Sequence, residues 1–342
     1  DKILKFTHNN FYAYLPSMLN SNSIYLIVLS LTPGIGPITA RKLLSVYDNA
    51  ENIFKDGISN LKKRQIINSS LVDKLFSKEV MENAEKELKF INKHNIQVLV
   101  FNDEEYPCRL KNCPDAPIVL YSKGNIKYNE LKVISVVGTR RSTEYGKEFT
   151  SKLIEDLKSE PIIIVSGLAH GIDTYAHQFA VKNELPTIAV LGHGLQMIYP
   201  AANKALARQI IKNGSLLTEF SSQSIPDKEN FPRRNRIIAG LADAVIVVEA
   251  NIKGGALITA EIATSYNRDV FAIPGKTTDT YSKGCNWLIK TNKAGLITSA
   301  EDLYYNMNWE FQHAKKTTKQ TSFILTEDEE KIFRILHEYG QS

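Results

Sequence analysis

The order of apolar and polar residues divides the chain into two unlike parts. Between residues 22 and 90 apolar residues recur at helical spacing, most clearly in residues 40–47 and 80–91, which predicts a set of short helices. From Lys132 onward, continuous apolar runs alternate with helical stretches, and most of the runs end at a glycine. Such alternation is typical of a parallel sheet covered by helices on both faces. The predicted strands are residues 132–137, 161–166, 186–191, 215–218, 244–248 and 269–273.

Two further segments differ from both parts. Residues 96–128 contain one short apolar strand, residues 96–101, and then three closely spaced prolines, which predicts a rigid, extended bridge. Residues 306–322 are polar and predict a linker, whereas residues 326–337 predict an amphipathic helix that opens a further domain. The expected organisation is a helical domain at residues 1–95, the bridge at 96–128, an α/β domain at 129–305, and a linker with the start of a truncated domain at 306–342.

A short turn lies between the first two predicted helices, at residues 32–37, with the sequence Thr-Pro-Gly-Ile-Gly-Pro. Two glycines around one apolar residue allow a tight turn that exposes backbone N–H groups. A helix-hairpin-helix uses such a turn to bind one phosphate at the start of the following helix. An ordinary turn between helices explains the same residues equally well, because a single Gly-x-Gly is a weak signal. Both interpretations stay open.

The composition of the chain indicates the class of protein but does not identify a binding partner. Hydrophobic residues make up 43% of the chain and charged residues 23%, which is ordinary for a packed soluble protein and excludes a disordered one. The net charge of +5 permits an anionic partner without requiring one. Three cysteines are an odd number in a long chain, which argues against a disulfide framework and for a cytoplasmic location. The longest apolar run, residues 24–31, is too short to cross a membrane.

The chemistry is expected where the predicted strands end, because ligands of open parallel sheets bind outside the carboxyl ends of the strands. Glycines at these ends would let an anion approach the backbone, and arginines and lysines in the same loops suit phosphates. A salt bridge to Glu219 or Glu249 is the simpler explanation for any single cation, but the whole set favours anion binding. The set comprises Gly138, Gly167, Gly192, Gly275, Arg140, Arg141, residues 228–236 with Phe231 as a possible stacking ring, Lys253 and Lys276.

The motifs that would compete with this interpretation are incomplete. The loop after the first strand does not follow Gly-x-Gly-x-x-Gly, and the stretch at Gly275 lacks the leading glycine of a P-loop. His170, Asp173 and His177 are spaced for one helical face, but Gly171 breaks the first turn, so we predict no metal site. No nucleophile elbow is present. We therefore predict no cofactor and no catalytic residue.

Several ordered motifs are more specific. They are Val137-Gly-Thr-Arg140, Ser166-Gly-Leu-Ala-His-Gly-Ile-Asp173, Leu191-Gly-His-Gly194, Tyr199-Pro-Ala-Ala-Asn203, Phe231-Pro-Arg-Arg-Asn-Arg-Ile-Ile-Ala-Gly-Leu241, Val247-Val-Glu-Ala250, Leu257-Ile-Thr-Ala260 and Ala272-Ile-Pro-Gly275. Together they resemble the DNA-processing protein A (DprA, also called Smf) family over about residues 100–305. The resemblance implies an extended Rossmann-like α/β fold, doubly wound and mostly parallel. It also implies a SAM-like or helix-hairpin-helix domain before it and a winged-helix domain after it.

The resemblance further implies a function. The family binds single-stranded DNA, forms homodimers and loads the RecA recombinase onto incoming strands in natural transformation. By the matching motifs Arg140 contacts DNA, Lys228 and Phe231 line the same groove, and the Arg-Asn-Arg run shapes a phosphate pocket. The predicted DNA-binding residues are Gly138, Thr139, Arg140, Arg141, Gly167, His170, Lys228, Phe231, Arg233, Arg234, Asn235, Arg236, Lys253, Gly254 and Gly255.

The chain departs from the family pattern in two places. His170 stands where a basic residue is usual, and a histidine carries only a fractional charge at neutral pH, which weakens that predicted contact. The sequence Gly254-Gly255-Ala256 replaces the usual Ser-Gly-Ser and so removes two hydroxyl groups. Backbone N–H groups could still bind an anion there.

Two other functions remain open on the residues alone. A nucleotide phosphoribohydrolase of the lysine-decarboxylase-like family would use a Gly-Gly…Thr…Glu motif with Glu261 as general base. The proline that precedes that motif is missing, and Glu261 follows Thr259 by two positions rather than three. An interaction scaffold with an unused rim is the other possibility. We predict a non-enzymatic protein that binds single-stranded DNA, with the hydrolase as the alternative.

Overall fold

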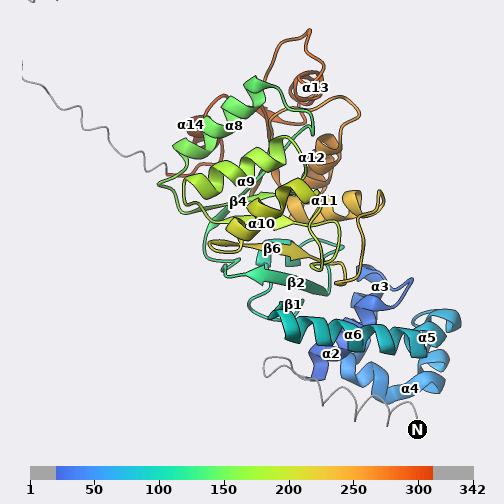
Figure 1. Cartoon of the computed structure of the whole chain (residues 1–342). Coiled ribbons are helices and arrows are strands. Elements are labelled where there is room, and N and C mark those ends of the chain that lie inside the picture. Colours follow the sequence, from blue (N-terminus) through green and yellow to red (C-terminus); the bar gives the residue numbers. More distant parts are fainter. Residues whose placement is uncertain (1–20, 311–342) are drawn as a thin grey trace, which may run out of the picture. The chain divides into compact units, whose positions relative to one another are not determined.

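The structure, a computed structural model, describes residues 21–310, which belong to one compact unit (Figure 1). The predicted amphipathic helix at residues 326–337, and with it the predicted start of a winged-helix domain, lies outside the described residues.

The helical pattern between residues 22 and 90 is confirmed. Asn49, Asn68 and Ser77 stand just before three of these helices, and each side chain accepts a hydrogen bond from a backbone N–H of the first turn. The apolar faces of the helices pack into one core. The helices are α2 (Ser21–Leu31), α3 (Pro37–Tyr47), α4 (Ala50–Arg64), α5 (Ser69–Leu75) and α6 (Lys78–His94). The SAM-like or helix-hairpin-helix character of this region stays a prediction.

The α/β part contains a sheet of nine strands among the described residues. All six strands predicted from apolar runs are present, and they pair in parallel. The order across the sheet is β1-β2-β6-β5-β4-β3-β7-β8-β9. The strands are β1 (Gln97–Val100), β2 (Val119–Gly124), β3 (Lys132–Val137), β4 (Ile162–Ser166), β5 (Thr187–Val190), β6 (Gly214–Thr218), β7 (Ala244–Val247), β8 (Asp269–Ala272) and β9 (Gly295–Leu296).

The extended bridge predicted at residues 96–128 is wrong. This segment forms β1 and β2, which extend the sheet by antiparallel pairing next to β6. A short helix between them, α7 (Cys108–Lys111), packs on the sheet through Leu110. The strand at Val119–Gly124 escaped prediction because it directly follows a cluster of prolines, which indicated a loop.

Helices cover both faces of the sheet. On one face α8, α9 and α10 follow one another across the parallel strands, and α6 covers the antiparallel end. On the other face α11, α12 and α13 share a core with α7 and the opposite sides of the strands. The helices are α8 (Glu144–Asp156), α9 (Ile172–Lys182), α10 (Lys204–Ile210), α11 (Asn230–Leu241), α12 (Gly255–Ser265), α13 (Lys283–Lys290) and α14 (Ala300–Asn306).

The strand order reverses between β3 and β7. From β3 the chain proceeds through β4, β5 and β6 on one side, and then returns to β7, β8 and β9 on the other. The chain therefore leaves β3 and β7 in opposite directions across the sheet. Directly after these strands the two loops are still joined, because the Thr139 N–H donates to the Glu249 carbonyl at 2.7 Å. Such a point in an open parallel sheet leaves a crevice for a ligand.

Candidate nucleic-acid interface

A hollow of about 440 Å³ opens at this reversal point, and we call it the strand-end hollow. Its walls come from the loops after β3, β6 and β7 and from the first turns of α11 and α12. Nine of the predicted binding residues line it together. They are Gly138, Thr139, Arg140, Lys228, Phe231, Arg234, Asn235, Gly254 and Gly255.

One of the two exposed cations of the strand-end hollow, Arg140, lies beside an aromatic ring. The Arg140 guanidinium carbon lies 5.1 Å from the centre of the Phe231 ring, a distance that allows a cation–π interaction. Arg140 and Lys228 are exposed and, within residues 21–310, neither forms an ion pair with a carboxylate. These two charges are therefore available to an anionic ligand.

Glu249 holds the loop that carries Arg140. Its carboxylate, buried at the end of β7, accepts hydrogen bonds from the backbone N–H of Thr143 at 2.9 Å and from the Thr143 hydroxyl. Gly146 in the first turn of α8 permits this approach, because a Cβ there would overlap the carboxylate. The predicted alternative, a salt bridge from a rim arginine to Glu249, is absent from the described part of the chain, since the partner is Thr143.

Arg234 forms the floor of the strand-end hollow. It is buried, and its guanidinium donates to the carbonyls of Gly167 and Val190 at the ends of β4 and β5. Burial lowers the pKa of Arg234 to about 10, so it remains a cation at neutral pH. Gly167 is needed for this contact, because a Cβ at that position would overlap the guanidinium. Arg234 therefore places a cation beneath the hollow, next to the buried carboxyl group of Asp173.

Arg236 requires a correction. It was predicted to contact DNA, but it is buried, lines no part of the strand-end hollow, and pairs with Glu219. Its guanidinium also donates to the carbonyl of Asp115. The helix turns by about 100° per residue, so neighbouring arginines of one run face different directions. Arg236 therefore joins α11 to the end of β6 and to the segment before β2.

A smaller space of about 20 Å³, the inner hollow, adjoins the strand-end hollow. Gly167 and His170, two of the predicted site residues, line it, and their roles stay predictions. Tyr199 also lines it and lies with its ring centre 6.2 Å from that of Phe231. We did not predict Tyr199, although it stands in one of the quoted motifs, because nothing in the sequence shows that its loop folds toward α11.

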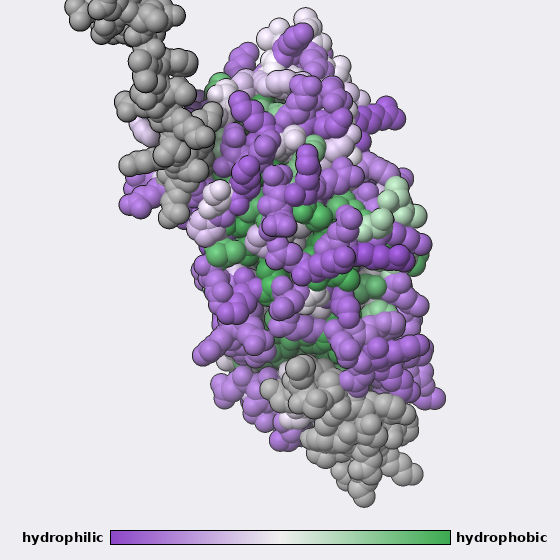
Figure 2. Space-filling view, turned by 60° about the vertical axis from the view of Figure 1, so that its left-hand side comes forward, coloured by the Kyte–Doolittle hydropathy of each residue, from purple (hydrophilic) through white to green (hydrophobic). Residues whose placement is uncertain are grey.

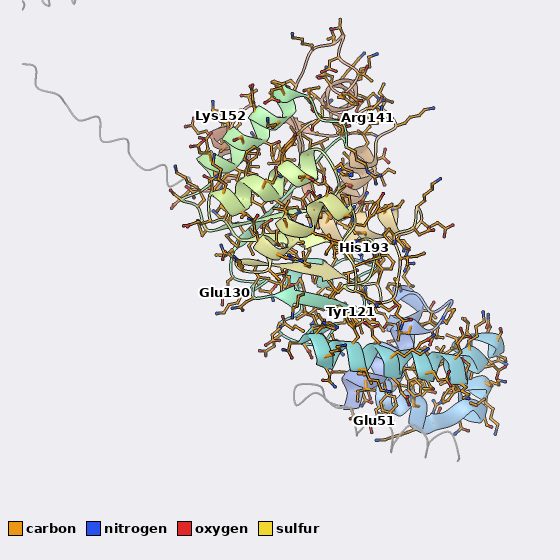
Figure 3. All side chains as sticks on the ribbon, viewed as in Figure 1. Glu51, Tyr121, Glu130, Arg141, Lys152 and His193 are labelled. Atoms are coloured by element: carbon orange, nitrogen blue, oxygen red, sulfur yellow. The ribbon has the colours of Figure 1, made fainter. Side chains whose placement is uncertain are left out.

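His193 shapes the loop that carries Tyr199. Its ring accepts a hydrogen bond from the Tyr199 backbone N–H at 3.2 Å, and its other nitrogen lies 2.9 Å from the Gly194 carbonyl. Burial lowers the pKa of His193, which favours the neutral ring that this pair of bonds requires. In Figure 3, His193 and Arg141 lie on the same side of the molecule, as expected for residues that follow parallel strands.

Besides Arg236, three predicted residues lie outside both hollows. Arg141, Arg233 and Lys253 are exposed, and the Arg233 guanidinium lies over the ring of Phe220 at 5.0 Å. Their roles stay predictions. Glu261, the general base of the alternative hydrolase, is exposed, lines neither hollow and lies 4.0 Å from Lys293.

Neither a metal cluster nor a membrane-spanning helix occurs in residues 21–310. No group of three His, Cys, Asp or Glu side chains there is arranged to hold a metal ion. His177 is fully buried, with Nδ1 2.8 Å from the Thr187 hydroxyl, whereas His170 is exposed. No helix of this part of the chain is both long and apolar enough to cross a bilayer.

Comparisons with known proteins agree with these motifs. The model of the family described as DNA recombination-mediator protein A matches residues 97–308. Protein Smf from Synechocystis is 38% identical over 290 residues, which cover 84% of this chain and 73% of that protein. The DNA processing protein DprA of Streptococcus pneumoniae is 46% identical over 201 residues, 59% of this chain and 71% of that protein.

Solved structures show the same likeness. The X-ray structure of DprA from S. pneumoniae superposes with a TM-score of 0.72 at 36% identity, over 86% of this chain and all of that one. DprA from Helicobacter pylori, whose structure addresses its single-stranded DNA binding mode, gives 0.57 at 29% identity, over 63% of this chain and 97% of that one. The predicted resemblance and the Rossmann-like fold are thereby confirmed, and the chain belongs to the DNA recombination-mediator protein A family.

Proposed function

We propose that this protein binds single-stranded DNA at the strand-end hollow and acts in DNA processing during natural transformation and homologous recombination. The observation that carries the proposal is the convergence of Arg140, Lys228 and Phe231 from different loops on one hollow. The two exposed cations match phosphates, and the ring offers a stacking surface for a base. The DNA-binding relative from H. pylori supports the same ligand class.

Sequence preference is expected to be weak. The cations and the backbone N–H of Gly255, at the start of α12, address the sugar–phosphate chain, and an aromatic ring stacks on any base. Duplex DNA is a poorer ligand, because its bases are stacked inside and cannot reach Phe231.

The proposed partners are single-stranded DNA, the RecA recombinase and a second copy of the chain. The last two rest on family membership. We propose a binding role rather than an enzymatic one. Glu261 lies outside the strand-end hollow, and the carboxyl group that does line the hollow, that of Asp173, is buried beside Arg234. The phosphoribohydrolase alternative is not favoured.

Fluorescence anisotropy with a labelled oligothymidylate tests the proposal. Affinity should fall with salt, with a slope of log K against log salt of about −0.7 for each phosphate contacted. A flat salt titration, or equal affinity for duplex and single strand, would contradict it. Incubation with nucleoside monophosphates, monitored for free base, tests the hydrolase separately.

A further inference from the structure

The loop that carries Tyr199 separates the inner hollow from a longer groove on the other side. One part of this groove, about 490 Å³, is lined by α10 and by the loop before it. The next part, about 470 Å³, is lined by the C-terminal end of α6 and by Lys123 of β2. Leu195, Gln196 and Leu216 line both parts, so we treat them as one feature, the α6–α10 groove.

The α6–α10 groove is continuous with the candidate site. Tyr199 lines both the inner hollow and the α10 part of the groove, and its side chain is exposed. The inner hollow in turn shares Arg140, Phe231 and Arg234 with the strand-end hollow. A ligand that passes from the site to the groove therefore passes over Tyr199.

The charge of the groove has one sign. The charged residues of its lining are Lys93, Lys123, Lys204 and Arg208, and the lining contains no Asp or Glu. Within residues 21–310, Lys93, Lys204 and Arg208 form no ion pair with a carboxylate. A strip of unpaired cations next to a site with the same character fits a continuing polyanion.

The end of α6 would otherwise oppose an anion, because the C-terminus of a helix carries partial negative charge. Lys123 reduces this effect, since its ammonium group donates to the carbonyls of His94 and Asn95 at that end. The potential along this part of the groove therefore remains positive.

The floor of the groove is apolar. Leu216, Ile211 and the exposed Met197 line the α10 part, and the half-buried Phe90 lines the α6 part. Figure 2 shows apolar residues at the surface among hydrophilic ones, so an apolar floor alone would not define a ligand. Together with the cationic rim, it suits unstacked bases that turn inward while the phosphates face the lysines and Arg208.

We propose that the α6–α10 groove binds the continuation of the same single strand beyond Tyr199. This proposal rests on the proposed function, since it extends the path of that ligand. It makes α6, a helix of the N-terminal region, part of the DNA footprint.

The test compares oligothymidylates of increasing length, from about 4 to about 16 nucleotides, on the whole chain. The variant Lys204→Ala/Arg208→Ala removes two groove cations that do not line the strand-end hollow. Lys152→Ala/Lys158→Ala removes the same charge from the surface of α8 and its end, and serves as the matched control.

The groove variant should bind the shortest oligonucleotides like the wild type but lose about tenfold in affinity for the longest. Its salt slope with long strands should be shallower by about 1.4, two contacts at about 0.7 each. If the affinities of wild type, groove variant and control increase equally with oligonucleotide length, the groove is not part of the DNA path. The groove would then bind another partner, such as an acidic peptide. If the wild type binds no oligonucleotide at all, the proposed function itself fails.

Discussion

The carboxylate of Glu87, on α6, accepts hydrogen bonds from both the backbone N–H and the hydroxyl of Ser222, which follows β6. The distances are 2.9 Å and 2.7 Å to Oε2, and 3.0 Å from the N–H to Oε1. Ser222 lies in the loop between β6 and α11, which carries Lys228 and leads to Phe231 in the first turn of α11. A buried acid of the N-terminal helices therefore positions a loop of the proposed DNA site.

Glu87→Gln should make stability less dependent on pH. Burial raises the pKa of Glu87, against the opposing effect of the bonds from Ser222. A carboxyl with a raised pKa in the folded state binds more protons when folded. Its contribution to stability is therefore complete below its ordinary pKa of about 4.3 and is lost as pH rises through the raised value. The glutamine can accept from the Ser222 N–H and does not ionise.

Thermal unfolding from about pH 4 to about pH 8 measures this effect. The stability of Glu87→Gln relative to the wild type should increase as pH rises. Glu82→Gln, the same change at an exposed position of α6, is the control and should leave the pH dependence unchanged. If the stabilities of Glu87→Gln and the wild type change in parallel with pH, Glu87 does not titrate in this range.

Arg140→Ala should weaken binding of oligothymidylate by about 1–3 kcal/mol, roughly 5- to 150-fold, without loss of stability. The reason is that Arg140 is exposed and has no carboxylate partner in the described residues, so its removal leaves no buried charge. Lys152→Ala on α8 removes one exposed cation, on the opposite side of the view in Figure 3 from Arg141, the neighbour of Arg140, and should bind normally.

Phe231→Leu tests whether the cation and the ring act together. Loss of a stacking ring costs about 1–3 kcal/mol per base. Because Arg140 lies over this ring, the two substitutions should not be additive. The double variant Arg140→Ala/Phe231→Leu should lose less binding free energy than the sum of the two single losses, by at least about 0.5 kcal/mol. Strictly additive losses would mean that the two residues contact separate parts of the strand.

The apolar runs were sufficient to predict the parallel strands, because each run is buried on both faces and shows no polar alternation. The same argument predicted that Arg140, Lys228 and Gly254 would meet, since parallel strands end at one edge. The argument from apolar runs failed where tertiary contacts determine the structure. β2 is recognisable only as the partner of β6, and the direction of Arg236 depends on the rotation of α11 and on Glu219.

Arg236→Ala should destabilise the protein by about 3–5 kcal/mol, because it leaves the buried carboxylate of Glu219 without its partner. Arg233→Ala, in the same run but exposed, should change stability by less than about 0.5 kcal/mol. Urea unfolding measures both. Arg236→Lys provides the converse test. If this variant keeps its stability and loses DNA binding, our correction is wrong and Arg236 belongs to the interface.

Gly255→Asp should separate binding from stability at the start of α12. Gly255 is exposed, and a Cβ there meets nothing within 4 Å, so a side chain fits. A carboxylate in the first turn of a helix interacts favourably with the free N–H groups, and replacing glycine removes an entropic cost. The variant should therefore be as stable as the wild type or more so, while its negative charge at the strand-end hollow repels phosphate.

The matched control is Gly255→Asn, which has nearly the same shape without the charge. At low salt the aspartate variant should bind oligothymidylate at least about tenfold more weakly than the asparagine variant, and salt should narrow the difference because it screens exposed charges. If the two variants bind equally at low salt, the strand does not pass Gly255. The path of the DNA would then have to be drawn from Arg140 toward Tyr199 alone, away from α12.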